Sequence, residues 1–163
     1  MKKTYLRLFG ALILLLGLTT TFVSCSSDDD NMETIVTVKD LPEEAQIFLN
    51  TYFKGIEVQS VEKIMNGNVA VYEVNLSNGF EIVFNSEGEW QEVDAPDNQS
   101  VPMEIIPEQI RATLNEQYPG YGVSEINTSG QNYVVELSNN QGGPSINLVF
   151  NQAGEIVDTG NMG

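Results

Sequence analysis

Histidine is absent from this sequence of 163 residues, and cysteine occurs only once. Because histidine is the usual general base of nucleophilic hydrolases, a catalytic triad is disfavoured. Histidine and cysteine are also the common ligands of zinc and other transition metals, so no metal site is expected. The single cysteine, Cys25, has no second cysteine with which to form a disulfide bond. We therefore expect a protein that is not an enzyme and that has no cofactor.

Basic residues are also scarce in this chain. It has 7 lysine and arginine residues against 23 aspartate and glutamate residues, and its formal net charge is −16 at pH 7. A surface with this charge repels nucleic acids and anionic lipid headgroups. Nucleic acid is therefore excluded as a partner, and a basic partner is favoured.

The N-terminal segment is expected to direct export rather than to fold. Three basic residues precede an apolar run over residues 8–18. The run has the length of a secretory signal and is shorter than the roughly 20 residues of a membrane-spanning helix. Residues 22–25, FVSC, then resemble a bacterial lipobox. That resemblance implies cleavage after Ser24 and lipidation of Cys25; the alternative is an ordinary signal peptide with an incidental cysteine.

Residues 26–30 are two serines followed by three aspartates. This stretch resembles the surface-export signal of lipoproteins from Bacteroidetes, and the alternative is a solvated acidic tether. The sequence therefore predicts an outer-membrane lipoprotein that contacts the membrane through its lipid anchor only. It leaves open whether the protein faces the periplasm or the cell surface.

Residues 76–90 predict two turns with a strand between them. Asn78-Gly79 is a pair preferred in type I′ hairpin turns, because both central residues of that turn need a positive φ. Side chains then alternate over residues 80–84, as expected for a strand with one buried face. Residues 85–88 end in a glycine and predict the second turn. A similar pattern returns over residues 137–156.

An amphipathic helix is predicted over residues 41–55. Pro42 suits its first turn, and two glutamates follow where the helix dipole favours acidic side chains. Apolar residues at spacings of three and four form one stripe, which needs a sheet to cover it. The stripe consists of Ala45, Phe48, Leu49, Tyr52 and Phe53. Residues 106–120 repeat this pattern at an offset of 65, and the last hairpin repeats the earlier one at an offset of 66.

These patterns predict an α+β fold of two tandem helix-plus-four-strand repeats. We expect the repeats to join edge to edge in one antiparallel sheet with both helices on one face, and face-to-face packing of the two units is the alternative. Residues 35–38 either add a strand or lie extended. The expected boundaries are 1–24 for a lipoprotein signal peptide, 25–38 for an acidic tether and leader, 39–94 for the first repeat, 95–101 for a linker and 102–163 for the second repeat.

Two blocks of motifs carry a family resemblance. The first block contains Leu41-Pro42, Tyr52-Phe53, Tyr72-Glu73-Val74, Asn78-Gly79 and Gly88-Glu89-Trp90, and the second contains Ile106-Pro107, Tyr118-Pro119, Tyr133, Leu137, Phe150 and Gly154. Together they resemble the PepSY-like lipoproteins of Bacteroides and relatives, which share the architecture of the β-lactamase inhibitor protein. The resemblance covers residues 40–158. It implies the fold, secretion and a capacity to bind another protein across the open sheet face, and it brings no catalytic residues.

The strand residues that point away from the helices are the candidate binding site. If Tyr72 and Tyr133 point toward the helices, the opposite face carries five valines, and Trp90 adds an aromatic contact. The candidate partner-binding residues are Val69, Val71, Val83, Trp90, Val134 and Val149. Valine is also an ordinary choice for a strand surface, so a purely structural role is the alternative.

The leading hypothesis is a secreted, lipid-anchored, non-enzymatic module that binds an envelope or extracellular protein or peptide through this face. The alternative is an accessory lipoprotein that binds a glycan or small ligand through aromatic side chains such as Trp90 and Tyr121. Calcium would suit Asp94, Asp97 and Asn98, but the ordered acidic loop of an EF-hand is absent. A solvated linker is the simpler interpretation of these three residues.

Overall fold

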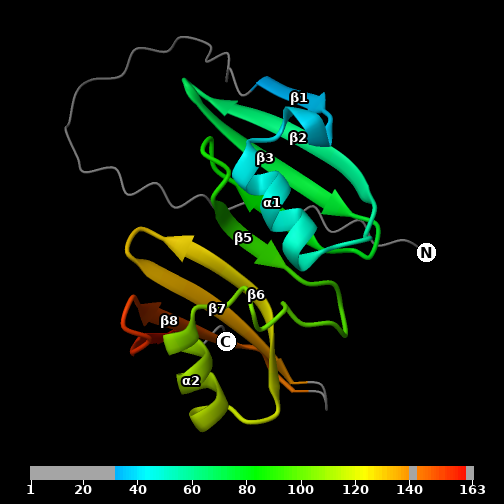
Figure 1. Cartoon of the computed structure of the whole chain (residues 1–163). Helices are drawn as coiled ribbons and strands as arrows, with labels where there is room; N and C mark the ends of the chain where they lie inside the picture. Colours follow the sequence, from blue (N-terminus) through cyan, green and yellow to red (C-terminus); the bar gives the residue numbers. More distant parts are fainter. Residues whose placement is uncertain (1–31, 140–142, 161–163) are drawn as a thin grey trace, which may run out of the picture.

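The described residues form nine β-strands, which follow one another across a single sheet, and each strand pairs antiparallel with the next. The computed structural model describes residues 32–139 and 143–160 (Figure 1). The strands are β1 Met32–Val36, β2 Val58–Asn66, β3 Val69–Leu76, β4 Glu81–Phe84, β5 Trp90–Asp94, β6 Tyr121–Ser129, β7 Asn132–Asn139, β8 Ile146–Asn151 and β9 Ile156–Gly160. Sequence neighbours are therefore also spatial neighbours throughout the sheet.

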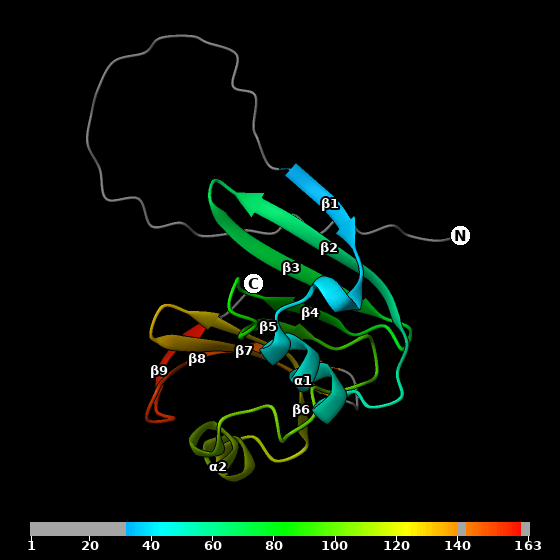
Figure 2. The same cartoon turned by 45° about the horizontal axis from the view of Figure 1, so that its top comes forward.

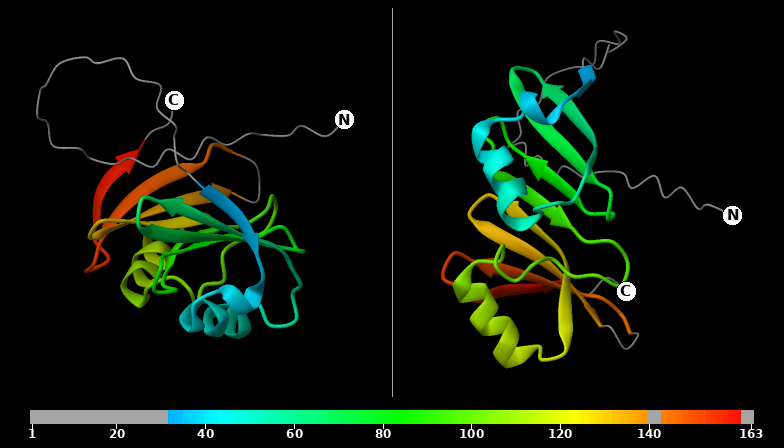
Figure 3. Two further views of the ribbon diagram at one scale, coloured as in Figure 1. Left: turned by 90° about the horizontal axis from the view of Figure 1, so that it is seen from above. Right: turned by 45° about the vertical axis from the view of Figure 1, so that its right-hand side comes forward.

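Two α-helices cover one face of this sheet: α1 spans Glu43–Tyr52 and α2 spans Glu108–Gln117. Each follows a proline, which is tolerated at a helix start because a backbone N–H there would have no acceptor within the helix. Figure 2 and Figure 3 show from different directions that both helices lie on the same side. The predicted α+β fold, with one antiparallel sheet and both helices on one face, is confirmed. In the described part of the chain, neither helix is long and apolar enough to cross a membrane.

The sheet is continuous across the junction between β5 and β6. Val93 of β5 pairs with Ile126 of β6, and neither side chain has exposed surface. The chain therefore adopts the edge-to-edge arrangement and not the face-to-face alternative. β1 pairs with β2 at the outer edge, so it forms a strand rather than an unpaired leader. We refer to α1 with β2–β5 as the first half, and to α2 with β6–β9 as the second half.

The core lies between the sheet and the two helices. Leu49 of α1 and Leu114 of α2 are buried in it, and Phe84 and Phe150 are its largest fully buried strand residues. The ring centroids of Phe48 and Phe84 are 5.4 Å apart in an edge-to-face arrangement. Burying a side chain of this size contributes about 1.5–3 kcal/mol. The helices need this contribution because helices of 10 residues are marginal alone.

Candidate functional site

The two helices leave the other face of the sheet uncovered, and we refer to that surface as the open face. Side chains of a strand alternate between the two faces of a sheet. On β3, Tyr72, Val74 and Leu76 are buried under the helices. Glu73 and Asn75, which lie between them in the sequence, therefore point to the open face and are half-buried there.

Four acidic residues on adjacent strands form a row across the open face, defined here as the first carboxylate row. Glu81 of β4 pairs with Asp94 of β5, which in turn pairs with Glu125 of β6. Glu125 pairs with Glu136 of β7. Residues directly opposite each other in antiparallel strands have Cβ atoms about 4.5–5.5 Å apart. One carboxyl group therefore stands on each of four successive strands, across the junction between the halves.

A second carboxylate row runs parallel to the first on the same face. Glu62 of β2 pairs directly with Glu73 of β3. Val83 of β4 lies between Glu73 and Glu92 of β5. Asn127 of β6 pairs with Glu92 and continues the row into the second half. The open face thus carries acidic side chains on every strand from β2 to β7.

No lysine or arginine belongs to either row. Lys63 is on β2, but it pairs with Tyr72, and its Nζ lies 5.8 Å from the centroid of that buried ring. It therefore belongs to the helix side of the sheet. Like charges directly opposite each other destabilise a sheet, and a surface of one sign attracts the opposite charge. The arrangement costs free energy in the isolated protein and favours contact with a cation-bearing partner.

The pKa of the Glu92 carboxyl is raised to about 7. Burial is the largest cause, because it penalises the charged form. The nearby carboxylates of Glu125, Asp94, Glu73 and Glu81 raise this pKa further. Glu92 is therefore the group whose charge changes near neutral pH, at the centre of the open face.

Burial also raises the pKa of the two other glutamates in the second row. For Glu73, a hydrogen bond from Asn75 opposes the effect; Asn75 Nδ2 lies 3.5 Å from Glu73 Oε1 and 3.2 Å from Ser60 Oγ. For Glu62, a hydrogen bond with Glu33 adds to the effect of burial. Burial first, and the neighbouring carboxylates second, therefore raise the pKa of these groups and disfavour full ionisation of the face.

The five predicted valines do lie on the open face, but they are not one apolar patch. Val134 and Val149 are directly opposite each other on β7 and β8. Val71 of β3 pairs with Ile64 of β2, in the first half and away from that pair. Val83 stands between two glutamates of the second row, and Val69 is 55% exposed at the start of β3. Glu92 and Asn127 therefore separate Val83 of the first half from Val134 and Val149 of the second half.

The inclusion of Trp90 in the candidate face is wrong. Counting back from the buried Val93 in steps of two would put Gln91 inside and Trp90 outside. A bulge interrupts the pairing of β4 with β5, so Trp90 pairs with the buried Phe84 instead. The Trp90 ring lies on the helix side, with its centroid 6.2 Å from that of Tyr133. Tyr121 also packs against the core.

The carboxylate rows were not identified from the sequence. Their signal is present in the sequence, because acidic residues occupy outward positions on several strands. What the sequence did not supply was the register of each strand pair, which decides whether these carboxyls meet. Without the strand register, the alternating valines are easier to recognise in the sequence than the rows of acidic residues.

A small pocket of about 150 Å³ lies where the linker after β5 meets the first carboxylate row. Asp94, Asp97 and Asn98 line it, together with Glu125 and Glu136. Within residues 32–139 and 143–160, no group of three or more acidic, histidine or cysteine side chains is arranged to hold a metal ion. The expected lipidation site, Cys25, lies outside the described residues.

A family model described as "Putative beta-lactamase-inhibitor-like, PepSY-like" matches residues 70–158, more than half of the chain. The chain belongs to this family. The matched region of the PepSY-like protein begins in β3 and ends in β9, so it includes the whole first carboxylate row. No curated protein matches the chain.

Three crystal structures from Bacteroides are similar to this PepSY-like protein. A Bacteroides thetaiotaomicron protein, described as a putative calcium-regulated periplasmic protein, is 29% identical with a TM-score of 0.71, and the match covers 79% of this chain and 97% of that one. A putative periplasmic protein from Bacteroides vulgatus is 26% identical with a TM-score of 0.73, covering 83% and 100%. A second from the same species, of unknown function, is 26% identical with a TM-score of 0.70, covering 80% and 100%. The fold described above is therefore shared along nearly the full length of these relatives.

Proposed function

We propose that this PepSY-like protein is a non-enzymatic binding module of the cell envelope, which holds a basic protein or peptide on its open face. The observation that carries this proposal is the pair of carboxylate rows on a sheet face that neither helix covers. The periplasmic description of the relatives supports an envelope location. Lipidation at Cys25 would hold the module at the outer membrane.

The proposal includes a tandem-repeat origin for the two halves, in the manner of the β-lactamase-inhibitor-like architecture. Its support is the order of elements, because an α-helix followed by four antiparallel strands occurs twice along the chain. Joining two such units edge to edge doubles the width of the open face. A wide sheet face suits a protein surface or an extended peptide better than a small ligand.

A basic partner relieves a cost that the free protein carries. Cationic side chains placed over the rows would pair with carboxyls that now repel one another, and they would lower the pKa of Glu92. Val83, Val134 and Val149 lie among these acids and offer apolar contact to the stems of lysine and arginine side chains. The face therefore offers charge and apolar surface in alternation.

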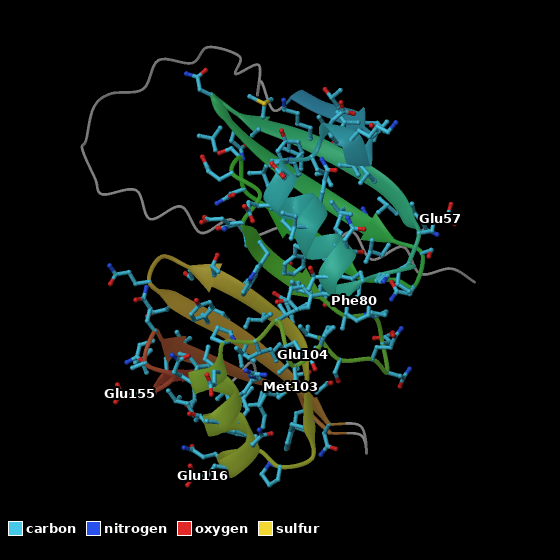
Figure 4. All side chains as sticks on the ribbon, viewed as in Figure 1. Glu57, Phe80, Met103, Glu104, Glu116 and Glu155 are labelled. Carbon is cyan, nitrogen blue, oxygen red and sulfur yellow. The ribbon has the colours of Figure 1, made fainter. Side chains whose placement is uncertain are left out.

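The test is a calorimetric titration of the protein with a twelve-residue peptide of alternating lysine and alanine, at low and at moderate salt. The test variant carries three neutral substitutions on the open face: Glu73→Gln, Glu92→Gln and Glu125→Gln. The control variant loses three charges elsewhere: Glu57→Gln, Glu104→Gln and Glu116→Gln. These three residues are exposed and lie away from the carboxylate rows: Glu57 before β2, Glu104 between β5 and α2, and Glu116 in α2 (Figure 4).

We expect the open-face variant to bind the peptide at least about tenfold more weakly, which corresponds to about 1.4 kcal/mol. The control variant should lose no more than about two- to threefold, because distant charges act only through the screened overall field. Equal losses in the two variants would show that the net charge alone attracts the peptide, and would refute a site on the open face. The same pair of variants, used as bait in envelope extract, then distinguishes a specific natural partner from adsorbed protein.

The glycan-binding alternative requires aromatic side chains on the open face. The structure turns Trp90 and Tyr121 toward the helix side, as described above. The alternative therefore has no support from the open face itself.

A further inference from the structure

A groove of about 880 Å³ lies on the helix side of the sheet, opposite to the open face. Its lining comes from α1, from β6 and β7, and from β5 with the turn that precedes it. Each helix lies over its own half of the sheet (Figure 2), and the groove extends from α1 of the first half to β6 and β7 of the second half. Its size is in the range of about 300–1,000 Å³ that is usual for binding sites.

Aromatic rings line this groove. Phe48 and Tyr52 come from α1, and their ring centroids are 4.8 Å apart. Trp90 of β5 and Tyr133 of β7 lie across the junction between the halves, 6.2 Å apart with an angle of 32° between the ring planes. Three of these side chains are partly buried and Tyr52 is exposed, so part of each remains accessible to a ligand.

Three carboxylates accompany the rings, and no lysine or arginine of the described residues lines the groove. Glu44 comes from the first turn of α1, and Glu87 and Glu89 come from the turn between β4 and β5. Glu89 is held in place by a hydrogen bond of 2.9 Å from Asn85 Nδ2 to its Oε2. All three glutamates are exposed. Aromatic faces attract cations, and carboxylates reinforce that preference.

The fold does not require this composition, because the second half keeps only one of its carboxylates, Glu155 at the position of Glu89, and lacks the aromatic residues. Thr113 stands at the position of Phe48, and its Oγ1 donates to the backbone oxygen of Gly154 at 2.8 Å. Gln117 stands at the position of Tyr52, and the other matching positions are Ile156 for Trp90 and Ala153 for Glu87. The aromatic and acidic residues thus occur together only where a neighbouring pair of strands forms the second wall.

We propose that this groove is a second binding site, which takes an arginine side chain from an extended segment of another protein. The planar guanidinium group stacks on aromatic rings and donates to carboxylates at the same time, which a lysine ammonium group does less well. The charge of the lining selects a cation over an anion or a neutral sugar. The site is separate from the open face, so it stands or falls independently of the function proposed above.

Trp90 is the only tryptophan of the chain, so its fluorescence reports on this groove alone. The experiment titrates the purified full-length protein with acetyl-Gly-Arg-Gly amide and, in parallel, with the same peptide carrying citrulline, which has the shape of arginine without its charge. We expect a saturable change in Trp90 emission with the arginine peptide, with a Kd on the order of 1 mM. The citrulline peptide should bind at least tenfold more weakly.

Two matched variants define the site. Glu44→Gln with Glu87→Gln removes two charges from the groove and should weaken the response at least fivefold. Glu108→Gln with Glu155→Gln removes two exposed charges from the helix start and the turn of the second half, and should leave the response unchanged. The open-face variant Glu73→Gln, Glu92→Gln and Glu125→Gln should also leave it unchanged.

The proposal is overturned by any of three results. The first is that the arginine peptide gives no saturable change in emission at concentrations up to 20-fold above the expected Kd, which is on the order of 1 mM. The second is that the citrulline peptide gives an equal response. The third is that the groove variant and the second-half variant lose the response equally. Neutral oligosaccharides of glucose and N-acetylglucosamine are titrated as well. A saturable response to a sugar without one to the arginine peptide would assign the groove to a glycan and would likewise refute the proposal.

Discussion

The turn between β4 and β5 in the first half and the turn between β8 and β9 in the second half are held by the same hydrogen bonds. Asn85 Oδ1 accepts from two backbone N–H groups at 3.0 and 2.9 Å, and Asn151 Oδ1 accepts from two at 3.0 Å each. Each turn ends in a glycine with a positive φ, 89° at Gly88 and 78° at Gly154. Each glycine is closed in by the first turn of its helix.

The strands that follow these two turns have different surroundings. β5 lies between β4 and β6, whereas β9 is the last strand of the sheet. Val93 of β5 is fully buried, and Thr159, at the matching position of β9, is exposed. Glu92 lies among carboxyls at the centre of the open face, and its counterpart Asp158 is exposed on the edge strand. A shared local structure thus acquires different energetics from its neighbours.

The largest expected effect tests what the halves share. A Cβ atom on Gly88 would lie 2.8 Å from the backbone nitrogen of Ala45, and one on Gly154 would lie 2.6 Å from the backbone carbon of Gln109. Gly88→Ala and Gly154→Ala should each lower the free energy of unfolding by about 3 kcal/mol, through a positive φ and a steric clash. Urea unfolding followed by circular dichroism measures this loss.

Gly130→Ala is the matched control for these two variants. Gly130 has a φ of 63°, and a Cβ atom there would meet nothing within 4 Å. Gly130→Ala should lower the free energy of unfolding by only about 1 kcal/mol, because only the unfavourable positive φ contributes and no atoms clash. Losses of the same size at all three glycines would contradict the role assigned to helix contact in both halves.

The second prediction separates the buried strand from the edge strand. Val93→Ala should lower the free energy of unfolding by about 2 kcal/mol, because it leaves a cavity at the junction of the halves. Thr159→Ala should change it by less than about 0.5 kcal/mol, because the side chain is exposed. Thermal and urea unfolding measure both losses. Equal losses of unfolding free energy in the two variants would contradict a contribution of the junction to stability.

The smallest effect concerns pH. The pKa of Glu92 is raised to about 7 in the folded protein, so the folded state binds more protons than the unfolded state between the ordinary glutamate pKa and pH 7. Stability from this group is therefore present at low pH and is lost as the pH rises through that range. Glu92→Gln should stabilise the protein at pH 8 by about 1 kcal/mol, after allowance for solvent screening of a partly exposed group.

The same substitution should have no stabilising effect at pH 4, where the Glu92 carboxyl is already protonated. Asp158→Asn is the charge-matched control in the second half, because that side chain is exposed on the edge strand. The measurement is the urea midpoint of each protein from pH 4 to pH 8. A Glu92→Gln profile parallel to that of the unsubstituted protein would contradict the raised pKa.

Much of the fold was predictable because its signals are local. The prolines before α1 and α2 and the turn glycines act through the backbone angles that they favour. The apolar stripes of the two helices repeat with the helical period. The valines of the open face were placed correctly for the same reason, since alternation along one strand decides the side. Trp90 was misplaced because a bulge breaks that alternation, and its position depends on pairing with another strand.

The sequence by itself therefore determined the helices, the turns, the inward and outward faces of most strands, and the acidic character of the molecule. Tertiary structure alone decided that β5 joins β6, that Trp90 turns toward Tyr133, and that four carboxyls stand in one row across β4–β7. The reason is the range of the forces involved. Backbone preferences act within a few residues, whereas strand register is set by pairing and packing between segments far apart in the chain.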